Sequence, residues 1–200
     1  MTPRFFIIDH SKHPWGDYGD MLTQGMACRG DSGVLEIERT GPFIPPMTFP
    51  GLGEVVVTDE LRLRLERSAL KGFVFEPVVK RLIVQSDWNT WDQLAEDPAE
   101  HPKSGEPEDY VLGQPHSVEA AAQMGNLWAI RLNREAQTQR EQQIVQSRRE
   151  IKLVNTTWRG QDIFGAQGVA FVYITEAAKL WLEGHLPGQL AFEEAATVAA

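Results

Sequence analysis

The sequence has little cysteine and no long apolar run, and each shortage excludes a class of protein. Cys28 is the only cysteine, so an internal disulfide and a multi-cysteine zinc site are both excluded. No stretch approaches the ~20 apolar residues that cross a bilayer. The apolar run at residues 5–8 is too short for a signal peptide. We therefore expect a cytoplasmic protein that does not enter a membrane.

Basic residues are also scarce: 19 lysines and arginines stand against 28 aspartates and glutamates, for a formal net charge of −9. Proteins that bind nucleic acids carry a basic surface that neutralises phosphate, and this chain has the opposite sign. We therefore expect no nucleic-acid partner. An acidic chain attracts basic proteins, although the acidity could also serve solubility alone.

The composition is that of a globular protein, with 42% hydrophobic and 24% charged residues, and its six tryptophans and nine phenylalanines provide bulky core material. A length of 200 residues suits one sizeable domain or two small ones. We predict a single compact domain over residues 1–200, with two related halves at about 1–90 and 116–200. An acidic excursion at residues 91–115 joins the halves.

Hydrophobic patterns predict an α+β fold with mixed sheets and a few short helices. Strands are expected at residues 4–9, 34–39, 55–57, 73–79, 127–132, 151–154, 171–174 and 190–193. Helices are expected at residues 59–70, 118–124 and 177–183. Residues 10–33 are rich in Gly, Asp and Ser and are predicted to form loops. The four prolines at residues 41–50 exclude a helix and a central strand there. Residues 134–149 fit either a helix or a hairpin arm.

Two segments share a strand–helix–strand pattern. In each, a threonine that can cap a helix, Thr58 or Thr175, follows a β-branched strand and precedes acidic residues. When Thr58 is aligned with Thr175, Leu65 falls on Leu182. We interpret the two units as products of a duplication, and two unrelated units of the same type are the alternative. The helix positions expected to face the core are drawn from Leu61, Leu65, Leu180 and Leu182.

Motifs for catalysis are weak. Residues 30–33 read GDSG, as around a protease nucleophile, but a serine needs a positioned base and an oxyanion hole. Cys28 has no histidine that the sequence marks as its base. We predict no catalytic residues and no cofactor. Residues 9–20 hold side chains that could ligate a metal, although we expect no metal site: Asp9, His10, His13, Asp17 and Asp20.

A different pattern begins at Trp88 and Trp91, which stand three residues apart and lead directly into the acidic excursion. Aromatic anchors beside a charged rim are typical of protein-binding surfaces, and two core tryptophans are the alternative. We therefore predict a partner-binding surface made of Trp88, Trp91, Asp92, Glu96, Asp97, Glu100, Glu106, Glu108 and Asp109.

Two regions resemble a known family. The run GPFIPPMTFPGLGEVVVTDELRLRLERSALKGFVFEPVVKR at residues 41–81, with Trp88 and Trp91 after it, resembles polymorphic-toxin immunity proteins related to the double-CxxCG-motif group. The segments WRGQDIF at 158–164, YITEAAK at 173–179 and FEEA at 192–195 are similar to that group as well. The resemblance covers residues 41–92 and 157–195. The CxxCG pairs are absent, so it implies no zinc knuckle.

The resemblance implies a bacterial cytoplasmic antitoxin. Such a protein binds and neutralises a cognate secreted or contact-delivered toxin without catalysis, and an adjacent gene encodes that toxin. Two alternatives stay open at this point. One is a small metal-dependent enzyme that uses residues 9–20, and the other is an interaction protein with no link to a toxin.

Overall fold

The computed structural model describes residues 3–51, 53–102, 105–140 and 148–199, and it has the predicted α+β architecture. The helices are α1 (Gly16–Gln24), α2 (Asp59–Glu66), α3 (Asp109–Leu112), α4 (Val118–Gln123) and α5 (Glu176–His185). The strands are β1 (Phe5–His10), β2 (Met26–Arg29), β3 (Leu35–Gly41), β4 (Met47–Gly51), β5 (Glu54–Thr58), β6 (Phe73–Pro77), β7 (Val79–Gln85), β8 (Leu127–Leu132), β9 (Thr138–Arg140), β10 (Ile151–Val154), β11 (Ile163–Gly165), β12 (Val172–Thr175), β13 (Leu190–Glu194) and β14 (Thr197–Val198).

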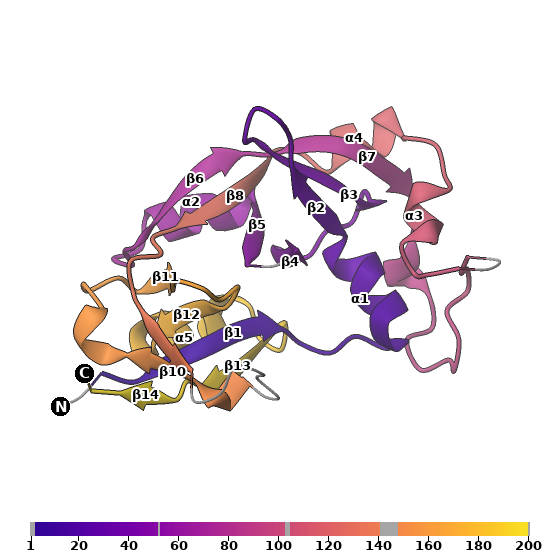
Figure 1. Ribbon diagram of the computed structural model, residues 1–200. Helices are drawn as coiled ribbons and strands as arrows, with labels where there is room; N and C mark the ends of the chain where they lie inside the picture. The colour runs from indigo at the N-terminus through magenta and orange to yellow at the C-terminus, as the bar shows by residue number, and fades with distance from the viewer. Residues whose placement is uncertain (1–2, 52, 103–104, 141–147, 200) are drawn as a thin grey trace. The chain divides into compact units, whose positions relative to one another are not determined.

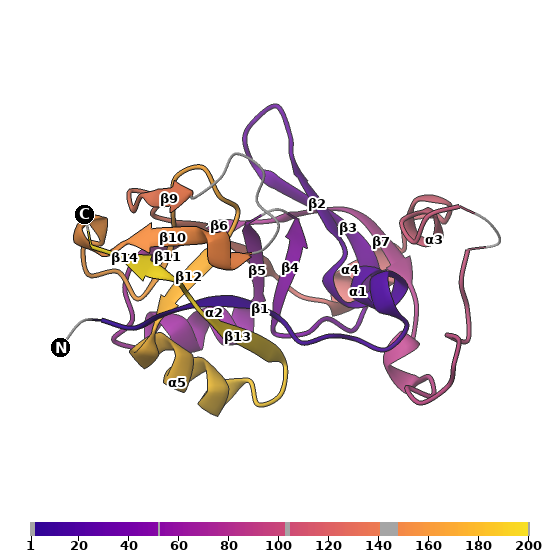
Figure 2. The same ribbon diagram turned by 60° about the horizontal axis from the view of Figure 1, so that its bottom comes forward.

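The described strands form four small sheets, with the orders β11-β12-β1-β13, β14-β10-β9, β2-β3-β7 and β4-β5-β8-β6 (Figure 1; β9 is labelled in Figure 2). Pairing is antiparallel between β1 and both of its neighbours, and parallel between β3 and β7 and between β10 and β14. The mixture of parallel and antiparallel pairs confirms the predicted mixed sheets. Within the described residues, no helix has the length and apolar character needed to span a bilayer.

The chain folds into two compact units that interleave along the sequence. Unit 1 contains Met1–Ser11, Leu65–Val74 and Arg131–Ala200, and unit 2 contains Lys12–Arg64 and Phe75–Ile130. Because the chain passes between the units several times, neither unit coincides with residues 1–90 or 116–200. That these units belong to one domain stays a prediction.

In unit 1, β1 lies between β12 and β13 and carries the apolar run at residues 5–8. All four residues of that run are buried. Phe5, Ile7 and Tyr173 belong to a core that also contains Leu153 and Phe164. Helix α5 packs against β12 and β1 (Figure 2).

In unit 2, α1 packs against β3, and α3 packs against β3 and β7. One core cluster is built from β3, β5, β7, β8 and α4. A second cluster contains Leu22 of α1, Val84 of β7, Trp88, and Tyr110 and Val111 of α3. This second cluster supports the acidic excursion, because α3 lies within residues 91–115.

Helix α1 was not predicted, since residues 10–33 read as loops. It forms because it buries Leu22 completely and because Arg39 of β3 binds its final carbonyl groups. The Arg39 guanidinium donates to the carbonyl oxygens of Thr23 at 2.9 Å and Gln24 at 3.4 Å. The last carbonyls of a helix have no partner within the helix, so tertiary contacts of this kind stabilise it.

Strands β5 and β6 flank α2, and strands β12 and β13 flank α5. One further strand lies between the two strands of each strand–helix–strand segment: β8 between β5 and β6, and β1 between β12 and β13. The next strand outward is β4 beside β5 and β11 beside β12. Pairing is antiparallel at β4–β5, β5–β8, β11–β12 and β12–β1. The two strand–helix–strand segments therefore share a strand order, and their origin by duplication stays a prediction.

The helix caps agree with the alignment, and one core position does not. Thr58 Oγ1 accepts from the backbone N–H of Leu61 at 3.4 Å, and Thr175 Oγ1 accepts from that of Ala178 at 3.3 Å. Leu61, Leu65 and Leu182 are buried as expected, but Leu180 is 63% exposed. Leu180 follows buried Ala178 by two residues, which places it on the opposite face of α5.

Two predicted boundaries were wrong. Helix α2 ends at Glu66 rather than near Leu70, because the Ser68 hydroxyl donates to the Leu65 carbonyl at 2.6 Å and so competes with the helical pattern. The predicted strand at 73–79 divides into β6 and β7 at Val78. Strand β9 occupies Thr138–Arg140, and residues 141–147 of the helix-or-hairpin prediction lie outside the described part of the chain.

Candidate functional site

The tryptophans at the start of the acidic excursion (residues 91–115) have different environments. Trp88 is 4% exposed, and its ring lies 5.2 Å from those of His13 and Phe43 in edge-to-face geometry. It is therefore a core residue with almost no surface for a partner, contrary to its predicted contact role. Trp91 is half-buried and lies 6.1 Å from the Trp15 ring, so it keeps accessible surface.

Aromatic residues from the start of α1 hold the excursion in place. The indole N–H of Trp15 donates to the carbonyl oxygen of Ala95 at 3.0 Å, and the Tyr18 hydroxyl donates to that of Glu100 at 2.7 Å. The backbone of Trp15 is left-handed, with φ at 71°, a conformation unusual for a bulky residue. The excursion is therefore an anchored surface segment. The sequence did not reveal these anchors, because Trp15 and Tyr18 stand about 80 positions away from their partners.

The Glu100 side chain is held as well. The Tyr110 hydroxyl donates to Glu100 Oε2 at 2.7 Å, and the rings of Tyr18 and Tyr110 meet edge to face at 5.8 Å. Burial raises the pKa of Tyr110, and the adjacent Glu100 carboxylate raises it further. Burial likewise raises the pKa of Tyr18. Both hydroxyls therefore remain protonated at neutral pH and continue to donate.

Most carboxylates of the excursion face solvent. Of the predicted residues, Asp92, Glu96, Asp97, Glu100, Glu106 and Asp109 are exposed, and Glu108 is half-buried. In the part of the chain that the structure describes, none of the seven forms an ion pair.

Acidic residues elsewhere in the chain are widely paired. Examples are Arg29 with Glu54 at 2.9 Å in unit 2 and Arg4 with Glu176 at 2.9 Å in unit 1. The contrast makes the described part of the excursion a region of concentrated negative charge whose carboxylates form no ion pair.

The turn at the start of the excursion is ordered by local hydrogen bonds. Asp92 Oδ1 accepts from the Leu94 backbone N–H at 2.9 Å, and the Gln93 amide donates to the carbonyl oxygens of Trp88 and Trp91 at 3.2 Å. Leu94 is 94% exposed at this turn. The apolar side chain of Leu94 is therefore exposed close in sequence to several carboxylates. Leu94 was not among the residues predicted to bind a partner.

An open groove lies within the excursion, beside α3. It has a volume of about 630 Å³, and its lining includes Glu100, Pro102, Asp109, Tyr110 and Gln114. The residues come from the middle of the excursion, at 99–102, and from α3 and the two residues after it, so the fold brings together two of the predicted carboxylates, Glu100 and Asp109. The groove itself could not be predicted, since it depends on how the segment folds back on α3.

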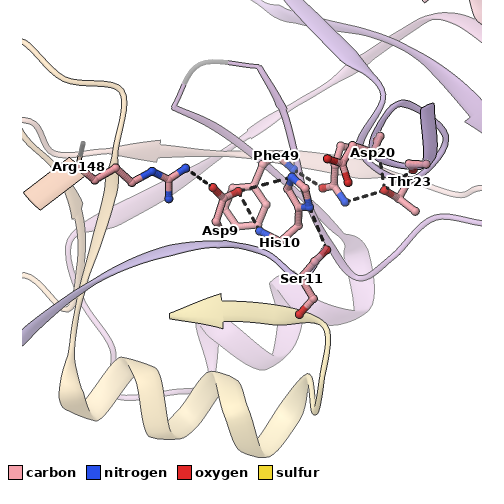
Figure 3. A network of polar contacts seen from close by, with 9 residues as sticks. Asp9, His10, Ser11, Asp20, Thr23, Phe49 and Arg148 are labelled. Atoms are coloured by element: carbon pink, nitrogen blue, oxygen red, sulfur yellow. Dashed lines mark hydrogen bonds and ion pairs between the residues drawn. The ribbon is translucent and has the colours of Figure 1, made fainter. Parts of the chain in front are cut away.

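The metal-binding alternative gains no support from residues 9–20. In unit 1, Asp9 Oδ2 forms an ion pair with Arg148 at 2.5 Å, and His10 Nδ1 lies 3.0 Å from the Ser11 carbonyl oxygen (Figure 3). In unit 2, His13 Nδ1 lies 3.1 Å from the Pro14 carbonyl oxygen. Within the described residues there is no group of three or more side chains suited to hold a metal ion.

The two weak catalytic motifs have structural contacts. Ser32 Oγ accepts from the backbone N–H of Val34 at 3.4 Å, as in a local turn. Cys28 is an exposed residue of β2 whose Sγ lies 3.8 Å from the Arg81 guanidinium. Neither contact supplies the base that a nucleophile requires.

Comparison of the chain with protein-family models, with curated proteins and with solved structures finds no match. The candidate site therefore rests on the contacts and charges of this chain alone.

Proposed function

We propose that the protein is an immunity protein, an antitoxin that binds a cognate bacterial toxin in the cytoplasm and blocks it without catalysis. The toxin is a basic protein encoded by an adjacent gene, and the acidic excursion is its docking surface. One observation carries the proposal: the excursion is anchored by Trp15 and Tyr18, while its carboxylates face solvent and form no ion pair with any residue that the structure describes.

The charge distribution favours binding over simple solubility. Residues 91–115 contain seven of the 28 acidic residues and a single lysine. Like charges held close together repel and destabilise a fold, whereas dispersed charges provide solubility at lower cost. A concentrated acidic surface attracts a basic partner over long range and raises the association rate.

The test compares two variants with the same loss of charge. The first removes three excursion charges by Asp92→Asn, Glu96→Gln and Asp97→Asn. The control removes three exposed charges elsewhere by Asp31→Asn, Glu119→Gln and Glu135→Gln. Binding of each to the toxin from the adjacent gene is measured at two ionic strengths. Because exposed charges act mainly on association, we expect about a tenfold slower association for the first variant at low salt and a small change at high salt.

Equal association of the two variants would show that the excursion is not the docking surface. The function itself is tested by co-expression: the wild-type chain should restore growth to cells that produce the toxin. If the neighbouring genes encode no toxin that this chain neutralises, the immunity function is wrong.

A further inference from the structure

The groove beside α3 contains two carboxylates that are already held in position. Glu100 is fixed at two points, its carbonyl oxygen by the Tyr18 hydroxyl and its Oε2 by the Tyr110 hydroxyl, both at 2.7 Å. Asp109 Oδ2 accepts from the backbone N–H of Glu106 at 3.1 Å. Side chains ordered before binding lose little conformational entropy when a partner arrives.

Each carboxylate keeps an oxygen for a partner. Among the described residues, Glu100 Oε1 and Asp109 Oδ1 accept no hydrogen bond, and neither residue forms an ion pair. Ala99, Pro102 and Tyr110 add apolar atoms to the lining, and His101 also lines the groove, with its Nδ1 3.1 Å from the Pro102 carbonyl oxygen. The groove thus offers anionic acceptors beside apolar walls, and its volume of about 630 Å³ leaves room for a long side chain.

We propose that this groove binds an arginine side chain of the partner protein. The inference deepens the proposed function and rests on it, because the partner in question is the toxin. A guanidinium is permanently charged, and its rigid fork of donors matches carboxylate oxygens. Its aliphatic stem can pack along the apolar walls. A lysine would present a compact, strongly hydrated point charge that makes less use of two carboxylates.

The groove and the rest of the acidic excursion control different steps of binding. Exposed carboxylates such as Glu96 and Asp97 act at a distance and set the association rate. Carboxylates that hydrogen-bond a seated guanidinium act after contact, so their loss mainly accelerates dissociation.

The first experiment uses isosteric variants of the full chain. Glu100→Gln with Asp109→Asn removes two charges inside the groove, and Glu119→Gln with Glu135→Gln removes two exposed charges outside the acidic excursion. We expect the groove variant to dissociate from the toxin about tenfold faster and the control to dissociate at the wild-type rate. Equal dissociation rates for the two variants would overturn the proposal that the groove binds an arginine side chain. Circular dichroism melting of both variants verifies the fold, since glutamine can still accept from Tyr110.

The second experiment does not need the toxin. The ¹⁵N-labelled chain is titrated with a capped tripeptide Gly-Arg-Gly, and the same peptide with citrulline is the control, because citrulline has nearly the same shape without the charge. We expect the arginine peptide to shift the amide signals of Glu100, Asp109 and Tyr110, and the citrulline peptide to leave them unchanged. Absence of arginine-dependent shifts at these residues, or equal shifts with a lysine peptide, would overturn the proposal.

The two experiments separate the two ideas. Arginine-dependent shifts in a protein that neutralises no adjacent toxin would leave the groove standing and reject the immunity function. Neutralisation of the toxin with no arginine-dependent shift would support the immunity function and reject arginine binding in the groove.

Discussion

The guanidinium of Arg39 donates a 2.9 Å hydrogen bond to the carbonyl oxygen of Thr23, and both residues are buried. Arg39 also donates to the carbonyl oxygens of Gln24 and Thr40. Burial lowers the pKa of Arg39 to about 9, because a charged group is less stable away from water. The hydrogen bonds to carbonyl oxygens compensate for that desolvation and join α1 to β3.

Replacement of Arg39 should therefore destabilise unit 2. In Arg39→Met, three carbonyl groups in a buried setting lose their partner, and the expected cost is about 2–4 kcal/mol in the free energy of unfolding. The measurement is urea unfolding followed by circular dichroism, with exposed Arg131→Met as the control. A loss no larger than that of the control would mean that water replaces the guanidinium at no cost.

The two threonine caps provide a matched pair. Removal of the hydroxyl by Thr58→Ala should cost about 1 kcal/mol, the usual value for an N-cap. Thr175→Ala should cost more, because Thr175 Oγ1 also donates to Asp162 Oδ1 at 2.9 Å and leaves that carboxylate without the bond. Thermal unfolding of the single variants gives both values. Equal losses would show that the bond to Asp162 contributes nothing.

Leucine-to-alanine changes on α2 and α5 should reduce the free energy of unfolding according to how buried each leucine is. Leu65→Ala removes a side chain that is 1% exposed and should cost about 2–5 kcal/mol in the free energy of unfolding. Leu180→Ala changes an exposed position and should stay within about 0.5 kcal/mol of the wild type. Chemical denaturation of both variants is the measurement. A similar loss for both would contradict the burial difference between them.

Loss of an anchor should loosen the excursion without unfolding the protein. Tyr18→Phe removes the hydrogen bond to the Glu100 carbonyl oxygen and keeps the ring against Tyr110. We expect faster hydrogen exchange at residues near 95–102 and unchanged exchange in β1 and β12. Unaltered exchange throughout would show that the remaining contacts are sufficient to order the segment.

One carboxylate should titrate below its ordinary range. Hydrogen bonding and charge from Arg4 lower the pKa of Glu194. Since the folded pKa lies below the unfolded one, the linked stabilisation is present above the unfolded pKa and is lost as pH falls through the folded pKa. NMR titration should give a pKa for Glu194 below the ordinary glutamate value, and Arg4→Ala should raise it toward that value.

Predictions from local pattern succeeded where the chain provides its own signal. The alternating and β-branched runs became β1, β3, β5, β8, β10, β12 and β13, and the threonine caps mark the starts of α2 and α5. The predicted acidic residues are exposed, apart from half-buried Glu108, because charged side chains are rarely buried unless they are paired. Trp88 failed as a contact residue because neighbours distant in sequence, His13 and Phe43, cover its ring.

The sequence by itself determined the α+β class, the caps and the concentration of negative charge in residues 91–115, since each of these depends on residues close together in the chain. Tertiary structure alone decided that α1 forms, which of two tryptophans remains accessible, and that Glu100 and Asp109 line one groove. Those outcomes depend on hydrogen bonds and burial between residues up to about 80 positions apart, such as Tyr18 with Glu100. Local propensity carries no information about such pairs, because only the folded chain brings them within bonding distance.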